Sequence, residues 1–75
     1  MAYENLIQHS SEILGGTPVF SGTRVPIQTL LDYLEEGSPL EDFLEDFPTV
    51  PKAMAVAVLE AAKKELIKSA YESAA

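Results

Sequence analysis

The sequence predicts a mainly α-helical domain: three helices in a helix-turn-helix-like arrangement, preceded by a small N-terminal antiparallel β element. Two stretches repeat apolar residues at i, i+3, i+4 and i+7, which is the spacing of one helix face. A longer helical stretch follows Pro51, and glycine turn signals separate short apolar segments within residues 1–25. Because 75 residues hold one domain, residues 1–75 are expected to form a single unit.

A β-hairpin is predicted at the end of the N-terminal segment. Residues 17–20 are typical of an extended strand, and Gly22 lies in a two-residue turn signal. Residues 23–25 are expected to return antiparallel to that strand. Val19 and Phe20 point to opposite faces of the strand, and both are apolar. Since three helices cover one face, we expect a second subunit to cover the other. Whether the hairpin is exchanged between subunits stays open.

The first helix is predicted over residues 26–36. Pro26 suits the first helical position, where its missing N–H would have no partner. Gly37 is expected to end the helix as a left-handed cap. The apolar stripe of this helix consists of Ile27, Leu30, Leu31 and Leu34.

The second helix is predicted over residues 38–47. Ser38 and Glu41 have the spacing of a capping box, in which each side chain bonds to the backbone N–H of the other residue. Pro48 stops the helix. The tight break between the first two helices is typical of a helix-turn-helix domain. The second apolar stripe consists of Leu40, Phe43, Leu44 and Phe47.

The third helix is predicted over residues 50–71, with Thr49 as its cap and Pro51 in its first turn. Residues 53–59 are all apolar, so we expect the start of this helix to be buried on several sides. Together with the hairpin, this run predicts a homodimer. The residues expected in the core or at the dimer interface are Val19, Phe20, Met54, Val58 and Leu59.

The net charge of −7 comes from one block of the chain, because the segments on either side are nearly neutral. This balance argues against non-specific coating of nucleic acid or of an anionic membrane. The block is either a solvated helical face or a docking surface for a basic partner. It consists of Asp32, Glu35, Glu36, Glu41, Asp42, Glu45 and Asp46.

The sequence favours no enzyme and no cofactor. His9 is the single histidine, and no residue that would orient it as a base can be identified. The absence of cysteine excludes disulfides and Cys-based zinc sites, and the acids lack a calcium-loop pattern. Five residues separate Gly16 from Gly22, and Pro18 removes an N–H, so this loop does not fit a phosphate cradle. We expect no metal, no small-molecule substrate and no membrane contact, and a cytoplasmic location.

Binding to DNA is the second function considered. The third helix opens with apolar residues and carries no Arg, Asn or Gln for reading bases. Lys63, Lys64 and Lys68 are the candidate phosphate contacts, and with so acidic a chain they predict weak, salt-sensitive binding.

Residues 16–27 read GTPVFSGTRVPI, and this string resembles the signature of domain of unknown function 433, roughly Gly-x-Pro-Val-Ile-x-Gly-Thr-Arg-Ile-Pro-Val. The strings LLDYLEEGS at 30–38 and LEDFLEDFP at 40–48 also resemble the family, whereas residues 49–54 lack its usual Glu-Asp pair. The likeness covers about residues 6–62. The residues that carry the signature and its turn are Gly16, Pro18, Gly22, Thr23, Arg24 and Pro26. We expect Arg24 to pair with an acidic helix or to bond hairpin carbonyls.

The resemblance implies a homeodomain-like or winged-helix-like fold, often dimeric. It also implies an antitoxin-like role for some members, of the VapB type, opposite a PIN-like ribonuclease of the VapC kind. Our leading hypothesis is therefore a homodimeric interaction module that neutralises a ribonuclease toxin. The alternative is a helix-turn-helix transcriptional regulator, including one that controls its own promoter.

Overall fold

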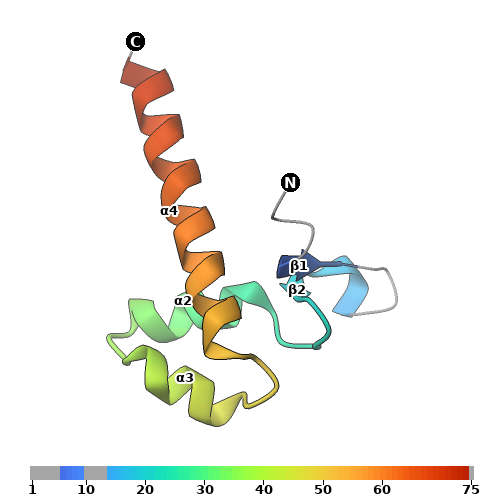
Figure 1. Ribbon diagram of the computed structural model, residues 1–75. Helices are drawn as coiled ribbons and strands as arrows, with labels where there is room; N and C mark the ends of the chain where they lie inside the picture. The colour runs from blue at the N-terminus through green and yellow to red at the C-terminus, as the bar shows by residue number, and fades with distance from the viewer. Residues whose placement is uncertain (1–5, 10–13, 75) are drawn as a thin grey trace.

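The computed structural model describes residues 6–9 and 14–74 and is mainly helical (Figure 1). Three helices and a small N-terminal two-stranded antiparallel sheet form the domain, as the sequence predicts. No helix among the described residues combines the length and apolarity needed to span a bilayer. The elements are β1 (Ile7–Gln8), the 3₁₀ turn η1 (Leu14–Gly16), β2 (Val19–Phe20), α2 (Ile27–Glu35), α3 (Leu40–Asp46) and α4 (Lys52–Ala74).

The segment after Gly22 returns antiparallel to β2, as predicted, but only as an isolated bridge between Val19 and Pro26. Two hydrogen bonds flank this bridge, from the Phe20 N–H to the Val25 carbonyl at 2.9 Å and from the Ile27 N–H to the Pro18 carbonyl at 3.1 Å. The expected strand at residues 23–25 does not form, because the chain enters α2 directly afterwards. The strand partner of β2 is β1, in the register Ile7 to Phe20 and Gln8 to Val19. The hairpin signal was local, whereas β1 lies more than ten residues away in the sequence.

Both side chains of β2 are buried within one chain. Val19 and Phe20 have no exposed surface, although they point to opposite faces. The argument for a second subunit from this strand is therefore wrong, because neither face is left to cover. The Phe20 ring packs on Phe43 with centroids 5.8 Å apart. The buried cluster consists of Phe20, Leu30, Phe43, Val50, Ala55 and Val58.

Helix α2 ends as predicted, at a left-handed glycine. Gly37 has φ 91°, its N–H donates to the Leu34 carbonyl, and the Ser38 N–H donates to the Tyr33 carbonyl. These two bonds form a Schellman motif, which satisfies carbonyls at the helix end. Pro26 is the residue before the first turn, and the helix begins at Ile27 rather than at the proline.

The capping box predicted for α3 is wrong. Pro39, in an extended conformation, precedes the helix, and no side chain caps it. The Ser38 N–H is already bonded to Tyr33 in the Schellman motif, so it is not available to a Glu41 side chain. Consequently α3 starts at Leu40, two residues later than expected, and ends at Asp46.

Helix α4 begins at Lys52, where the Pro51 carbonyl accepts the N–H groups of Met54 and Ala55. Pro51, not Thr49, is therefore the residue from which the helix starts, and the helix continues past residue 71 to Ala74. Its opening run is not buried on several sides: Ala55 and Val58 are buried, whereas Val56 is 41% exposed. That prediction is wrong because alanine and valine tolerate partial exposure, so an apolar run does not by itself define burial.

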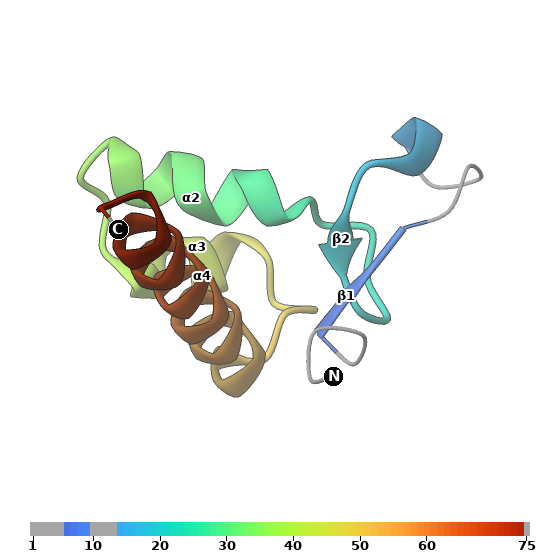
Figure 2. The ribbon, with the colours of Figure 1, turned by 90° about the horizontal axis from the view of Figure 1, so that it is seen from above.

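The second half of α4 extends away from the rest of the domain (Figure 1), and in the view from above its C-terminal end lies toward the viewer (Figure 2). Every residue from 62 to 73 is exposed. We call residues 62–73 the α4 tail.

Candidate functional site

The signature segment is a turn that joins β2 to α2. Gly22 has φ 77°, and its N–H donates to Gln8 Oε1 at 2.7 Å. The Thr23 hydroxyl donates to the Phe20 carbonyl at 2.8 Å and accepts the Val25 N–H at 3.0 Å. These bonds fix where α2 leaves the sheet, so Gly22 and Thr23 have structural roles in this turn.

Arg24 differs from its neighbours in the same turn. It is exposed, and it forms no ion pair or side-chain hydrogen bond with any described residue. The expected pairing of Arg24 with an acidic helix or with hairpin carbonyls is therefore wrong. The Thr23 hydroxyl already donates to the Phe20 carbonyl, the hairpin carbonyl that an arginine could otherwise bond, and it also accepts the Val25 N–H.

The acidic block forms one set of exposed side chains on α2, α3 and the residue after α2. All seven carboxylates from Asp32 to Asp46 are exposed, and none forms an ion pair with a described residue. Glu41 and Asp42 lie in the first turn of α3, where the helix dipole favours negative charge. We call these seven residues the acidic surface.

One hydrogen bond ties the acidic surface to the aromatic core. The Tyr33 hydroxyl of α2 donates to Asp46 Oδ2 of α3 at 2.6 Å. This bond to a carboxylate raises the pKa of Tyr33, and partial burial and the charges of Asp46 and Asp42 act in the same direction. The Tyr33 ring also meets Phe43 edge-on, with centroids 5.6 Å apart.

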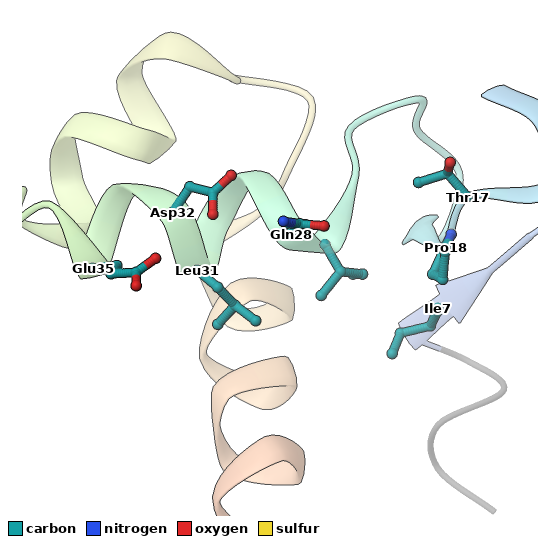
Figure 3. Close-up of a pocket in the computed structure, with 8 residues that line it drawn as sticks. Ile7, Thr17, Pro18, Gln28, Leu31, Asp32 and Glu35 are labelled. Atoms are coloured by element: carbon teal, nitrogen blue, oxygen red, sulfur yellow. The ribbon is translucent and has the colours of Figure 1, made fainter.

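A recess lies between the sheet end of the domain and the outer face of α2 (Figure 3). Its volume is about 570 Å³. Figure 3 shows Ile7 and Pro18 on one side and Leu31, Asp32 and Glu35 on α2. A smaller hollow shares Ile7 and Ile27 with it and reaches α4. The lining of the recess consists of Ile7, Thr17, Pro18, Ile27, Gln28, Leu31, Asp32 and Glu35.

Sequence reasoning missed this recess, because its lining comes from three separate segments of the chain. The sequence contributes one part of the signal, because Leu31 belongs to the predicted apolar stripe of the first helix. The structure supplies the other part, since this side chain is 42% exposed. Pro18 of the signature lines the recess, whereas Gly16 sits at the end of η1 with φ 95°.

The α4 tail carries a second uncovered apolar surface. Leu66 is 70%, Ile67 50% and Tyr71 77% exposed. The candidate phosphate contacts Lys63, Lys64 and Lys68 are exposed on the same tail, where Lys63 Nζ lies 3.9 Å from Glu60 Oε2 of its own helix. Sequence reasoning noted these lysines but not the apolar side chains between them.

The residues predicted for the core or dimer interface divide between two environments. Val19, Phe20 and Val58 are buried inside one chain, whereas Met54 and Leu59 are half-buried and pack against the core cluster. His9 is exposed. Among residues 6–9 and 14–74, no three histidine or acidic side chains come together as ligands for a metal ion.

Comparison with known proteins identifies the family. The sequence profile of DUF433, described as a protein of unknown function, matches residues 7–61. Uncharacterized protein y4eO of Sinorhizobium fredii is 39% identical over 49 residues, which are 65% of this chain and 22% of that protein. The chain thus spans about a fifth of the length of this curated relative.

The fold also matches a solved structure. The crystal structure of a DUF433 member protein from Anabaena variabilis superposes with a TM-score of 0.69 at 25% sequence identity. The match covers 97% of this chain and 72% of that one. The profile match over most of the chain and the shared fold agree, and the protein belongs to the DUF433 family of proteins of unknown function.

Proposed function

We propose that this protein is an antitoxin-like interaction module: a homodimer whose acidic surface docks on a basic, PIN-like ribonuclease and masks its substrate groove. The observation that carries the proposal is the acidic surface itself. Seven exposed carboxylates lie on consecutive elements and have no cationic partner among the described residues.

Uncompensated charge of this density has a physical consequence for binding. A ribonuclease groove binds the phosphates of RNA, so it presents positive charge, and carboxylates on helices α2 and α3 are complementary to it. Complementary charge speeds encounter and selects the partner more than it adds affinity, and salt screens it. The proposed complex therefore forms more slowly as ionic strength rises.

The backbone that carries the acidic surface is fixed by the core, and this also supports docking. The Phe43 ring of α3 has no exposed surface, and the Tyr33 hydroxyl of α2 donates to Asp46 of α3. Helices that are already held in place need not be ordered when a partner binds, so the cost falls on the exposed side chains alone.

Binding to DNA as a regulator has weaker support from the same side chains. The exposed positions in the opening turns of α4 are Lys52, Ala53 and Val56, which offer one charge and no Arg, Asn or Gln. The remaining lysines lie on the α4 tail beside Glu65 and Glu72. DNA binding therefore remains an alternative proposal with phosphate contacts alone.

The test is co-expression with the product of the neighbouring reading frame, followed by co-purification and a cleavage assay on a synthetic single-stranded RNA. We expect co-purification and inhibition of cleavage. Replacing Glu41, Asp42 and Glu45 by their amides should slow association at least tenfold at low salt. The matched control replaces Glu60, Glu65 and Glu72 by glutamine, which removes the same charge from α4 and should leave association unchanged.

Two outcomes overturn the proposal. One is a neighbouring product that neither binds this chain nor cleaves RNA. The other is a complex that responds equally to both sets of substitutions, because the acidic surface would then have no special part in docking.

A further inference from the structure

Two apolar surfaces of this chain lack a partner among the described residues: the recess and the α4 tail. Leu31 at the recess is 42% exposed, and Leu66 and Tyr71 on the tail are more than two-thirds exposed. Single exposed apolar side chains are normal on a small monomer, but at the recess Leu31 adjoins Ile7, Pro18 and Ile27, and apolar surface grouped in this way favours contact with a partner. The recess is concave and the α4 tail is convex, so their shapes are complementary.

We propose that the α4 tail of a second copy of this chain lies in the recess, and that the two copies exchange their tails reciprocally. The inference rests on the homodimer in the proposed function and specifies how it is built. It names the second copy as the occupant of the recess because this chain supplies a helix with the matching shape and charge.

The apolar side chains of the tail fit a helix-in-groove contact. Ile67 and Tyr71 follow the spacing i and i+4, which places them on one side of the helix, and Leu66 lies about 100° around the helix from Ile67. Such a side is the usual ligand of an apolar groove between structural elements. The recess, with about 570 Å³, has room for two or three side chains of this size.

Charge complementarity supports the same pairing. The charged residues that line the recess are Asp32 and Glu35, both acidic and both without an ionic partner among the described residues. On the tail, Lys64 and Lys68 flank the apolar side chains and are exposed. A tail placed in the recess brings these lysines to the carboxylates.

The arrangement also satisfies the symmetry of a closed dimer. A two-fold axis repeats each contact, so the recess and the tail of both copies are covered at once. The α4 tail needs no refolding for this contact, because it already extends from the domain as a helix (Figure 1). The apolar side chains of the recess and of the tail are then covered in both copies, whereas Val56, which is 41% exposed, stays outside the contact.

The first test measures the oligomeric state of the full chain by sedimentation velocity from 1 to 100 µM. We expect a dimer, and we expect Ile67→Ser together with Leu66→Ser to raise the dissociation constant at least a hundredfold. Leu31→Glu in the recess should have a similar effect. These side chains lie outside the buried cluster, so circular dichroism should show an unchanged helical content. A wild-type chain that is monomeric at 100 µM overturns the proposal.

The second test exchanges charges and distinguishes the tail-in-recess dimer from other dimers. One variant carries Lys64→Glu and Lys68→Glu, and the other carries Asp32→Lys and Glu35→Lys. Each alone places like charges together and should dimerise at least tenfold more weakly. Mixed, they should form a heterodimer preferentially, since each tail then meets a recess of opposite charge. The control replaces Asp42 and Glu45 of α3 by lysine and should leave dimerisation unchanged.

The outcomes separate this inference from the proposed function. If the recess variant dimerises as tightly as the wild type, or if the mixture forms no heterodimer, the tail does not lie in the recess. In this dimer Asp32 and Glu35 face the lysines of the second copy, so the part of the acidic surface that stays open to a ribonuclease is on α3 and at Glu36. Docking on α3 is measured separately, with the Glu41, Asp42 and Glu45 variant. Conversely, a negative ribonuclease test does not change the interpretation of the heterodimer experiment.

Discussion

The two halves of α4 belong to one helix and have opposite surroundings. Ala55 and Val58 in the first half are buried in the core, whereas Leu66 and Tyr71 in the second half are more than two-thirds exposed. The local sequence differs only in part, because residues 53–59 are all apolar whereas charged residues interrupt the apolar side chains of the tail. The difference teaches that the first half is held by the domain, whereas the second half depends on helix propensity and on whatever covers it.

The largest expected effect is the loss of stability when a buried ring is removed, compared with removal of an exposed side chain of the tail. The ring of Phe43 has no exposed surface and lies 5.1 Å from Phe47 and 5.8 Å from Phe20, centroid to centroid. Phe43→Ala should lower the free energy of unfolding by about 3–5 kcal/mol, as measured by urea denaturation.

The matched substitution in the tail is Leu66→Ala. At a protein concentration low enough to keep the chain monomeric, it should cost less than about 0.5 kcal/mol, because the side chain is exposed and alanine favours helix. The cost of Leu66→Ala should grow with protein concentration, whereas that of Phe43→Ala should not. Equal costs at all concentrations would contradict the distinction between the two halves.

A smaller effect is expected at the turn that sets the direction of α2. Thr23→Ala removes a hydroxyl that bonds both the Phe20 carbonyl and the Val25 N–H. Loss of these two bonds should lower the free energy of unfolding by about 1–2 kcal/mol. Thr23→Ser keeps the hydroxyl and should recover most of the loss. A serine variant as unstable as the alanine variant would show that the methyl group, not the hydroxyl, stabilises the turn.

The smallest effect concerns the ionisation of Tyr33. Because its hydrogen bond to Asp46 raises its pKa, the folded state holds the phenolic proton more tightly than the unfolded state. The bond therefore stabilises the fold below pH 10, and this contribution is lost as the pH rises through the raised pKa. Ultraviolet titration should show one tyrosine that ionises later than the others.

Two variants check the assignment of that late step. Tyr33→Phe should abolish it, and Asp46→Asn should move it toward the ordinary range, since a neutral amide has no charge to repel phenolate. Late ionisation that persists in Tyr33→Phe belongs to another tyrosine and would contradict the assignment.

The elements set by local sequence were predictable, and those set by distant contacts were not. Gly37 ends α2 as predicted, because a left-handed cap depends on one residue and its near neighbours. The prediction of a capping box at Ser38 and Glu41 was wrong, because the Ser38 N–H donates to the Tyr33 carbonyl in the C-cap of α2. The pairing of β1 with β2 joins residues eleven and thirteen positions apart, which no turn signal indicates.

The candidate site shows the same limit. The acidic surface is visible in the sequence because its seven residues lie between positions 32 and 46. The recess is not, because Ile7, Pro18 and Leu31 meet only after the sheet and α2 have formed. The sequence predicted a structural partner for Arg24. The hydrogen bonds that close the turn come instead from the hydroxyl of its neighbour Thr23.

Helix α4 is continuous and is anchored in the core near one end, so a small rotation at its buried residues produces a large displacement at its far end. The helix runs without interruption from Lys52 to Ala74, and its buried contacts, Ala55 and Val58, lie near one end. With a rise of about 1.5 Å per residue, the part beyond Val58 is about 25 Å long, so a tilt of about 10° moves its tip by about 4 Å. Substitutions of the buried side chains beneath α4 therefore change the position of the far end of the helix, although they lie far from it.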